Sequence, residues 1–239
     1  EGIDPRKDTK LHTVCIGAEP HSEEQRKRIE QLLGVKAYNC FGMSEMNGPG
    51  VAFECTEQNG LHIWEDNVIV EIVDPVTLQP VPEGEVGELV LTTINREAMP
   101  LLRYRTRDLT CILPGDCPCG RTHKRLARFK GRSDDMIILK GVNLFPIQIE
   151  KILMQFKELG SNYLITLETI GNSDEMLIEV ELSDLFTDDY SALQRLTKGI
   201  TRQLKDELLL TPRIKLVAKG SLPTTDGKAV RVKDHRKLC

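Results

Sequence analysis

Two segments in the first half of the sequence carry side chains suited to a nucleotide or a cation. Residues 41–45, Phe-Gly-Met-Ser-Glu, follow a strand-like run and combine an aromatic ring, a hydroxyl and a carboxylate. Such a set can face a base, donate to a phosphate and hold Mg²⁺, although a plain surface loop is an equally common reading. Residues 104–108, Tyr-Arg-Thr-Arg-Asp, end in a carboxylate that can accept hydrogen bonds from two ribose hydroxyls. Taken alone, that carboxylate is more often half of an ion pair.

Two segments in the second half have the composition of a hinge and of a mobile turn. Residues 131–135, Gly-Arg-Ser-Asp-Asp, lie where a β-rich region gives way to a mixed one. Glycine and short polar residues suit a backbone that changes its dihedral angles, as they suit any linker. Residues 223–228, Pro-Thr-Thr-Asp-Gly-Lys, place a lysine on a glycine-containing turn, where a solvated charge is the commoner role. Each of the four segments is weak evidence of function when taken alone. Their order along the chain is more informative.

The seven cysteines favour free thiols or a metal site over disulfides. Their number is odd, their spacing is uneven and no secretory signal precedes them. The tight turn at 117–120, Cys-Pro-Cys-Gly, can aim two thiolates at one point, and a predicted hairpin is bracketed by Cys55 and His62. We therefore predict a structural zinc site formed by Cys55, His62, Cys117 and Cys119, with Cys111 as a competing ligand. Free cysteines in β turns are the equal alternative, and four protein ligands leave no open position for a catalytic zinc.

Composition places the chain among ordinary globular proteins. It has 239 residues, 32 basic against 36 acidic side chains, a net charge of −4 and 40% apolar residues. These values argue against disorder, and scattered basic residues argue against nucleic acid as a partner. The sequence contains no apolar window of about 18 residues and no amphipathic leader, so we expect no membrane and a cytoplasmic location. Because the chain begins at Glu1, just before a strand-like run, we interpret it as a piece of a longer polypeptide.

The elements that must position these residues fall into three parts of a mixed α+β fold. Residues 1–48 read as strand, turn and helix, the end of an α/β sheet layer, with Ser22 as N-cap and Leu32 among the buried positions of the helix. Residues 49–132 alternate in short β-branched runs between Pro/Gly turns and predict a barrel-like β subdomain. Residues 133–239 predict a small α+β domain with a helix beginning at Pro146, strands near 162–168 and 176–182, and a longer helix over 188–210.

In this order, the four segments resemble the acyl-adenylate-forming superfamily, which includes acyl-CoA ligases, adenylation domains of peptide synthetases and luciferases. The resemblance spans essentially the whole chain and is closest to the phenylacetate-CoA ligase family. It includes residues 17–20, 48–52, 61–66 and 141–146 besides the segments above. Arg107 stands where most of the superfamily has glycine, and this arginine is typical of the phenylacetate branch.

The resemblance implies a role for each matching residue. Gly17, Ala18 and Glu19 would line an adenine pocket, and Phe41 and Gly42 would wall the nucleotide and acyl site. The remaining implied roles are phosphate contact by Ser44, Mg²⁺ binding by Glu45, ribose binding by Asp108 with Arg132 beside it, a hinge at Asp134, passage of the CoA pantetheine arm past Gly141, and adenylation by Lys228. The small C-terminal domain would be mobile, because the lysine must leave before the CoA thiol attacks.

The resemblance implies an ATP-dependent, AMP-forming CoA ligase for an aryl acid, with phenylacetate favoured. Its partners would be the acid, ATP with Mg²⁺, and CoA; a homodimer is considered and the oligomeric state stays open. The Ser/Thr/Gly-rich phosphate loop of the superfamily has no counterpart in this sequence, so we interpret the chain as a C-terminal portion that is inactive alone. The alternatives are an adenylyl-transferring relative that makes no thioester and a non-catalytic, zinc-stabilised interaction module.

Overall fold

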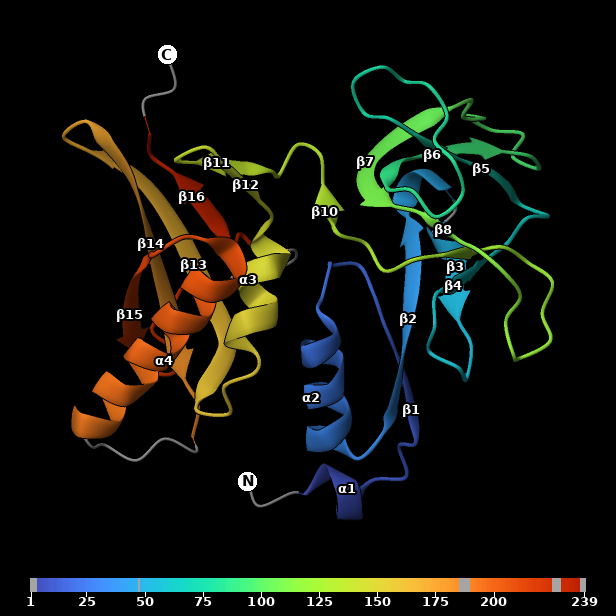
Figure 1. The fold of residues 1–239 in the computed structure, drawn as a ribbon. Helices are drawn as coiled ribbons and strands as arrows, with labels where there is room; N and C mark the ends of the chain where they lie inside the picture. The colour runs from blue at the N-terminus through green and yellow to red at the C-terminus, as the bar shows by residue number, and fades with distance from the viewer. Residues whose placement is uncertain (1–3, 47, 185–189, 225–228, 237–239) are drawn as a thin grey trace. The chain divides into compact units, whose positions relative to one another are not determined.

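The computed structural model describes residues 4–46, 48–184, 190–224 and 229–236. The chain divides into two compact units, which are described separately. The first comprises Glu1–Pro20 and Ile29–Asp135, and the second comprises His21–Arg28 and Met136–Cys239. Helices and several open sheets alternate along the chain, which confirms the predicted mixed α+β class (Figure 1). No helix of the described residues is both long enough and apolar enough to cross a membrane.

The first unit contains a six-stranded and a four-stranded sheet. The first sheet has the order β1-β2-β3-β4-β9-β8 and the second the order β10-β7-β6-β5. The strands of the first sheet are β1 (Thr13–Ile16), β2 (Lys36–Met43), β3 (Gly48–Glu54), β4 (Leu61–Ile63), β8 (Ile112–Leu113) and β9 (Arg125–Leu126). Those of the second are β5 (Val68–Val73), β6 (Gly87–Thr93), β7 (Tyr104–Thr110) and β10 (Gly131–Arg132). The helices of this unit are α1 (Pro5–Asp8) and the 3₁₀ turn η1 (Ser44–Met46), whereas α2 (Glu23–Leu33) is divided between the two units after Arg28. Among the described residues of these two sheets, only β1 and β2 pair in parallel.

The prediction that the β subdomain is barrel-like is wrong, because neither sheet closes. Closure requires the two edge strands of a sheet to pair with each other, whereas β5 and β10 stay at opposite edges of the second sheet. Strands β3, β4, β8 and β9 instead continue the sheet begun by β1 and β2. Two-residue strands such as β8, β9 and β10 present too few backbone groups to complete a barrel wall. Both sheets contribute to one apolar core that includes Leu61, Leu89, Leu91 and Leu126.

Helix α2 begins as predicted, but one residue of its predicted buried stripe is exposed. The Gln25 N–H donates to the Ser22 hydroxyl over 3.2 Å, which is the expected N-cap hydrogen bond. Leu32, predicted to be buried, is 62% exposed, whereas Arg26 is buried. The half-buried Ile29 and Leu33 lie on the same face as Arg26, whose guanidinium bonds to the carboxylate of Glu23 one turn earlier.

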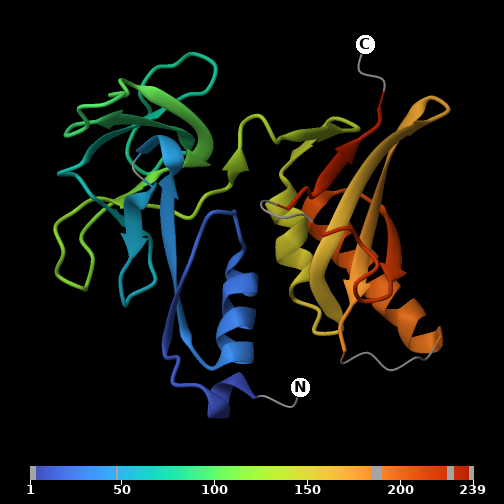
Figure 2. The ribbon, with the colours of Figure 1, turned by 180° about the vertical axis from the view of Figure 1, so that it is seen from behind.

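The second unit is a four-stranded sheet with two helices packed on one face (Figures 1 and 2). The sheet order is β15-β14-β13-β16, and a separate hairpin joins β11 to β12. The elements are β11 (Ile137–Leu139), β12 (Val142–Leu144), α3 (Pro146–Leu153), β13 (Leu159–Ile170), β14 (Ser173–Leu182), α4 (Tyr190–Leu208), β15 (Arg213–Val217) and β16 (Val232–Asp234). The strands expected near 162–168 and 176–182 are present and longer than predicted, and α3 begins at the expected proline.

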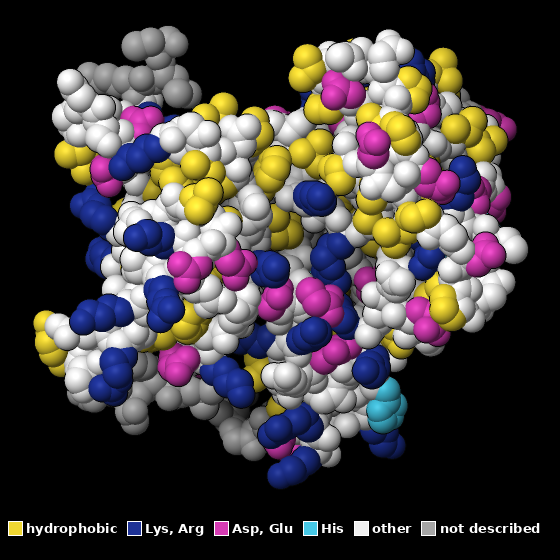
Figure 3. All heavy atoms as spheres, viewed as in Figure 1, with side chains coloured by type: hydrophobic (Ala, Val, Ile, Leu, Met, Phe, Trp, Pro, Cys, Tyr) yellow, Lys and Arg dark blue, Asp and Glu magenta, His cyan; other side chains and the backbone are white. Residues whose placement is uncertain are grey.

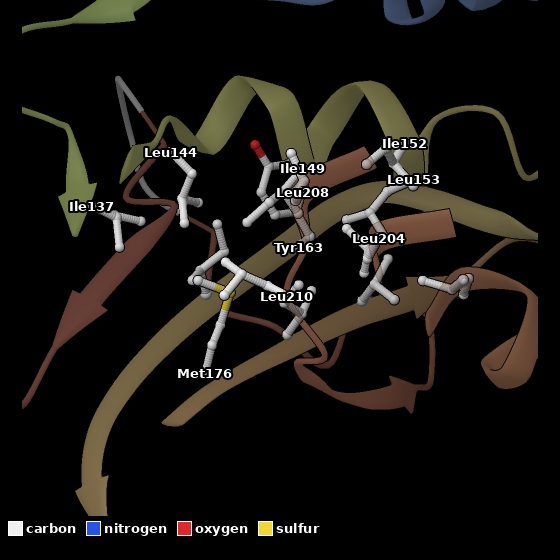
Figure 4. Packing of buried hydrophobic residues seen from close by; sticks show 14 of the residues in the cluster. Ile137, Leu144, Ile149, Ile152, Leu153, Tyr163, Met176, Leu204, Leu208 and Leu210 are labelled. Atoms are coloured by element: carbon white, nitrogen blue, oxygen red, sulfur yellow. The ribbon is translucent and has the colours of Figure 1, made fainter. Parts of the chain in front are cut away.

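The core of the second unit forms where α3 and α4 meet the sheet. Helix α4 buries Leu196, Ile200, Leu204 and Leu208, which recur every four residues. These side chains meet leucine and isoleucine side chains of α3 and Tyr163 of β13 (Figure 4). On the face of the molecule in Figure 3, lysine and arginine side chains are interspersed with acidic ones.

Candidate functional site

The turn after β1 lies against β2, and its first residue must be small. Strands β1 and β2 run parallel with Ile16 opposite Asn39, so their carboxyl ends point the same way. A Cβ atom on Gly17 would lie 2.5 Å from the carbonyl oxygen and 2.7 Å from the sulfur of Cys40. Ala18 follows with φ of +68°, a left-handed conformation that is uncommon for a residue with a side chain. The turn at 17–19 is thus held close to β2.

The carboxyl end of β2 carries the aromatic ring and leads into the hydroxyl and carboxylate of the second segment. The Phe41 ring packs on Phe129 with centroids 4.4 Å apart, and the β2–β3 register shifts next to it, around Gly42. Ser44 is exposed and Glu45 is half-buried in the single turn of η1. The Glu45 carbonyl accepts a hydrogen bond from the Arg96 guanidinium, which fixes the backbone from which the carboxylate projects.

Asp108 and Arg132 face each other across two paired strands. They are register partners in the antiparallel pair β7–β10, with 3.9 Å between Oδ1 of Asp108 and Nη1 of Arg132. Arg132 also makes a bidentate pair with Asp134, at 2.9 and 2.8 Å, and its hydrogen bonds lower the pKa of the Asp134 carboxyl. The Asp108 side chain keeps 15% of its surface exposed. A carboxylate at this position can accept hydrogen bonds from the hydroxyls of a ligand.

One short segment joins the aromatic and the acidic parts of this site. Phe129, which packs on Phe41, stands three residues before Arg132, and the Lys130 N–H donates to the Leu109 carbonyl over 2.9 Å. Residues 129–132 therefore run from the end of β2 to the strand that carries Asp108. The structure thus brings segments 41–45, 104–108 and 131–134 of the sequence to one region of the first unit.

Sequence reasoning missed Phe129, Arg96 and a buried ion pair between β6 and the strand that carries Asp108. Glu88 of β6 is fully buried, and its carboxylate binds Arg105 at 2.6 Å and lies 3.8 Å from Arg107. The only sequence signals were an arginine at alternate positions of segment 104–108 and a phenylalanine just ahead of segment 131–135. Neither says which partner it meets, because the partners lie 17 to 88 residues away in the chain.

One predicted site residue of the second unit, Gly141, is described by the structure. Gly141 lies in the two-residue turn between β11 and β12, where Lys140 and Gly141 have φ of +51° and +80°. A Cβ atom on Gly141 would meet no atom within 4 Å, so the turn's dihedral angle rather than space calls for glycine. Lys228 lies outside the described residues, and its predicted role stays a prediction.

The four predicted metal ligands also come together in the first unit. Their ligand atoms, one each from Cys55, His62, Cys117 and Cys119, all lie within 4.8 Å of one another, and the group does not include Cys111. Burial raises the pKa of the Cys55 thiol to about 11. The backbone N–H of Arg121 lowers the pKa of the Cys119 thiol to about 7. Burial also lowers the pKa of His62, which favours the neutral imidazole.

Comparison with known proteins identifies relatives for both parts of the chain. The family model for AMP-binding enzymes matches residues 4–95, and that for the AMP-binding enzyme C-terminal domain matches residues 141–236. The phenylacetate-coenzyme A ligase of Thermus thermophilus is 42% identical over 251 residues, which covers 99% of this chain and 56% of that enzyme. The enzyme of the same name from Pseudomonas putida is 44% identical, with 99% and 53% covered. The chain therefore spans about half the length of the curated relatives it matches.

A solved structure shares the architecture as well. A crystal structure of 2-hydroxyisobutyryl-CoA ligase in the postadenylation state, in complex with R3-HIB-AMP, is 31% identical with a TM-score of 0.89. The match covers 97% of this chain and 50% of that one. This neighbour contains an acyl-adenylate, the mixed anhydride of a carboxylic acid and AMP.

Proposed function

Because the chain belongs to the AMP-binding enzymes of the acyl-adenylate-forming superfamily, we propose that it is the C-terminal portion of an ATP-dependent, AMP-forming aryl-acid CoA ligase. Phenylacetate is the acid we favour, since the curated relatives at 42% and 44% identity are phenylacetate-coenzyme A ligases. In the first half-reaction the carboxylate attacks the α-phosphorus of ATP and pyrophosphate leaves. In the second, the CoA thiol attacks the acyl carbon and AMP leaves.

One observation carries this proposal. Phe41 packs on Phe129, and Phe129 lies three residues before Arg132, the partner of Asp108. An aromatic wall near a carboxylate suits a nucleoside, since the ring can face the base and the carboxylate can accept hydrogen bonds from both ribose hydroxyls. Gly17, Ala18 and Glu19 would border the adenine. These roles come from the family resemblance and agree with the geometry of the first unit.

The first unit also offers donors that fit Mg²⁺ and phosphate. Glu45 is half-buried on a backbone held by Arg96, and its carboxylate oxygens are ligands that Mg²⁺ prefers. The exposed hydroxyl of Ser44 can donate to a phosphate oxygen. When bound, Mg²⁺ would offset charge on the phosphoryl oxygens. Lys228, Gly141 and the hinge at Asp134 complete the proposed catalytic set.

The test is a nucleotide-site substitution in the full-length enzyme. Asp108→Asn should weaken ATP-dependent adenylation of phenylacetate about ten- to hundredfold, the loss expected from hydrogen bonds to a charged acceptor. Pyrophosphate release measures this step. Asp206→Asn, on an exposed side chain of α4, is the matched control and should leave the rate unchanged. Equal rates for the wild type and Asp108→Asn would remove Asp108 from the site.

CoA dependence separates the proposal from the adenylyl-transferring alternative. A CoA ligase releases AMP and forms a thioester only when CoA is present, whereas an adenylyl transferase passes the nucleotide to another metabolite. AMP release by the full-length enzyme that does not respond to CoA would favour the alternative. We further propose a cytoplasmic location, and sedimentation of the full-length enzyme would test a homodimer.

A further inference from the structure

We propose that Cys55, His62, Cys117 and Cys119 form a structural zinc site that ties two loops of the first unit together. The site is separate from the proposed nucleotide site, and its test does not depend on ligase activity. Cys55, His62 and Cys117 are buried, and Cys119 is half-buried.

The distances fit a tetrahedral shell with an atom at its centre. With Zn–S bonds of about 2.3 Å and Zn–N bonds of about 2.0–2.1 Å, tetrahedral geometry places two sulfurs about 3.8 Å apart and a sulfur and a nitrogen about 3.6 Å apart. The sulfurs of Cys55 and Cys117 are 3.7 Å apart, and the Cys119 sulfur is 3.4 Å from Nε2 of His62. A disulfide would require sulfurs about 2.05 Å apart.

The hydrogen bond on the far side of His62 leaves the correct nitrogen free for a metal. Nδ1 of His62 lies 3.4 Å from the carbonyl oxygen of His123. A carbonyl can only accept, so Nδ1 carries the proton and Nε2 presents its lone pair toward Cys119. Metal-binding histidines commonly donate their second ring nitrogen to a carbonyl in this way, which fixes both tautomer and ring orientation.

The backbone delivers the four ligands from two loops that are already in contact. Cys55 directly follows β3 and His62 lies in β4, so the β3–β4 hairpin supplies two ligands. The other two come from the turn 117–120, closed by a hydrogen bond from the Gly120 N–H to the Cys117 carbonyl with Gly120 at φ of +80°. Strand β9 pairs with β4 and holds this turn beside the hairpin.

A buried arginine, Arg125, connects these two loops by hydrogen bonds. The Arg125 guanidinium donates to the Asn59 carbonyl in the hairpin at 2.9 Å, and to the carbonyls of Gly115 and Asp116 in the other loop at 3.1 and 3.3 Å. The cluster therefore rests on a preorganised frame rather than on a chance meeting of mobile thiols. Preorganisation lowers the entropic cost of binding.

Charge balance at the cluster also suits a tris-thiolate metal centre. Binding exchanges protons for the metal: Zn²⁺ plus three thiols and a neutral imidazole gives a complex of charge −1 and releases three protons. Arg121 lines the same pocket as His62, so its positive charge lies near the cluster and can offset the remaining negative charge. With four protein ligands the shell is closed, which assigns the metal a structural rather than a catalytic role.

Metal content of the purified chain tests the site. The 239-residue chain, prepared without chelators and freed of loose metal, should contain about one zinc per chain by elemental analysis. An organomercurial should release that zinc as three thiols react. After replacement by Co²⁺, the protein should show the intense visible absorption of a tetrahedral cobalt–thiolate centre, which requires no variant.

Two matched substitutions assign the ligands. Cys119→Ser, at a half-buried position, should lower zinc affinity more than tenfold in a competition with a chelator. Cys15→Ser, an exposed thiol on β1, should leave zinc content unchanged. Circular dichroism of both variants shows whether each is folded, and the cobalt spectrum of the wild type stands whatever the variants do.

Three results would overturn the proposal. The first is less than a tenth of an equivalent of zinc together with no cobalt–thiolate absorption. The second is a disulfide between Cys55 and Cys117 in the metal-free chain that persists after zinc is offered. The third is retention of zinc by Cys119→Ser with its loss from Cys111→Ser, which would replace the ligand set.

Discussion

Glu88 shows how a single buried charge supports the strand that carries Asp108. Its side chain is fully buried, and it accepts hydrogen bonds from Nε and Nη2 of Arg105 at 2.9 and 2.6 Å. Burial by itself would raise the pKa of this carboxyl, but the Arg105 hydrogen bonds and the nearby charges of Arg105 and Arg107 lower it overall. The pair thereby ties β6 to β7, the strand that carries Asp108.

We predict that Glu88→Gln destabilises the chain by about 1.5–3 kcal/mol near neutral pH, the typical contribution of hydrogen bonds to a charged group. Because the folded-state pKa lies below the ordinary value of 4.5, this stability is present above that value and is lost as pH falls through the folded pKa. The difference between wild type and variant should therefore shrink in acid. Urea unfolding at neutral and acid pH measures it, with the exposed Glu83→Gln as control. A pH-independent difference would contradict the ion pair.

Lys228 is the residue on which the first half-reaction is predicted to depend. In the full-length enzyme, Lys228→Ala should lower adenylation by about 10²–10³-fold, the range for losing one charge-stabilising group. Thioester formation from a supplied acyl-adenylate should change much less. Rapid-quench assays of the two half-reactions separate these effects, and Lys219→Ala, an exposed lysine of the same unit, is the control. Equal losses in both half-reactions would remove Lys228 from adenylation.

At the residue scale, the sequence predicts a site when its residues lie close together along the chain. It does not predict contacts between residues that are far apart along the chain. The Cys-Pro-Cys-Gly turn and the bracketing pair Cys55 and His62 were found because a tight turn and a hairpin bring their own ligands together. The packing of Phe129 on Phe41 spans 88 positions and has no local signal. The same holds for the link between Glu88 and Arg105, since arginine on a strand face is usually solvated.

At the element scale, the periodicity of apolar residues predicted where most helices and strands lie. It did not predict whether the edge strands of a sheet pair, or the exposure of every residue on a helix. The four-residue spacing of leucine and isoleucine in α4 predicts its buried face, and the structure confirms Leu196 and Leu204 there. In α2 the same reasoning was wrong for Leu32, which is exposed, and it gave no signal that the charged Arg26 is buried with Glu23 as its ion-pair partner. Likewise, alternating strands predict a sheet but carry no information on whether its edges meet.

The β11–β12 turn gives the second unit a testable requirement for glycine. Gly141 at φ of +80° should lose about 1–2 kcal/mol of stability when changed to alanine, the cost of a left-handed conformation with a Cβ atom. Gly199→Ala, within α4, is the control, and it should change the stability in the opposite direction. There a Cβ would make ordinary contact with Phe156 at 3.5 Å, so the change should stabilise by about 0.4–1 kcal/mol. Thermal unfolding compares the two, and a neutral Gly141→Ala would contradict the turn geometry.

At the scale of the whole molecule, the chain contains the residues proposed to hold the nucleoside. It also contains the small domain proposed to withdraw Lys228 after adenylation, so that the CoA thiol can reach the acyl group. What it does not contain is a glycine-rich loop able to cradle the β- and γ-phosphates. Such loops bind phosphate through several backbone N–H groups at once, and they neutralise the pyrophosphate leaving group as it departs. The relatives matched by this chain are about twice its length.

We therefore predict that the 239-residue chain, tested by itself, forms no acyl-adenylate. Without the phosphate cradle, charge that develops on the leaving pyrophosphate is left to solvent, and preorganised stabilisation of such charge is usually the largest single contribution to catalysis. Contacts to base and ribose can still hold AMP weakly, so binding and chemistry should separate. Pyrophosphate release is measured with ATP, Mg²⁺ and phenylacetate, and AMP binding by calorimetry on the same sample. Release at a rate typical of CoA ligases would mean that the first unit supplies a phosphate site of its own.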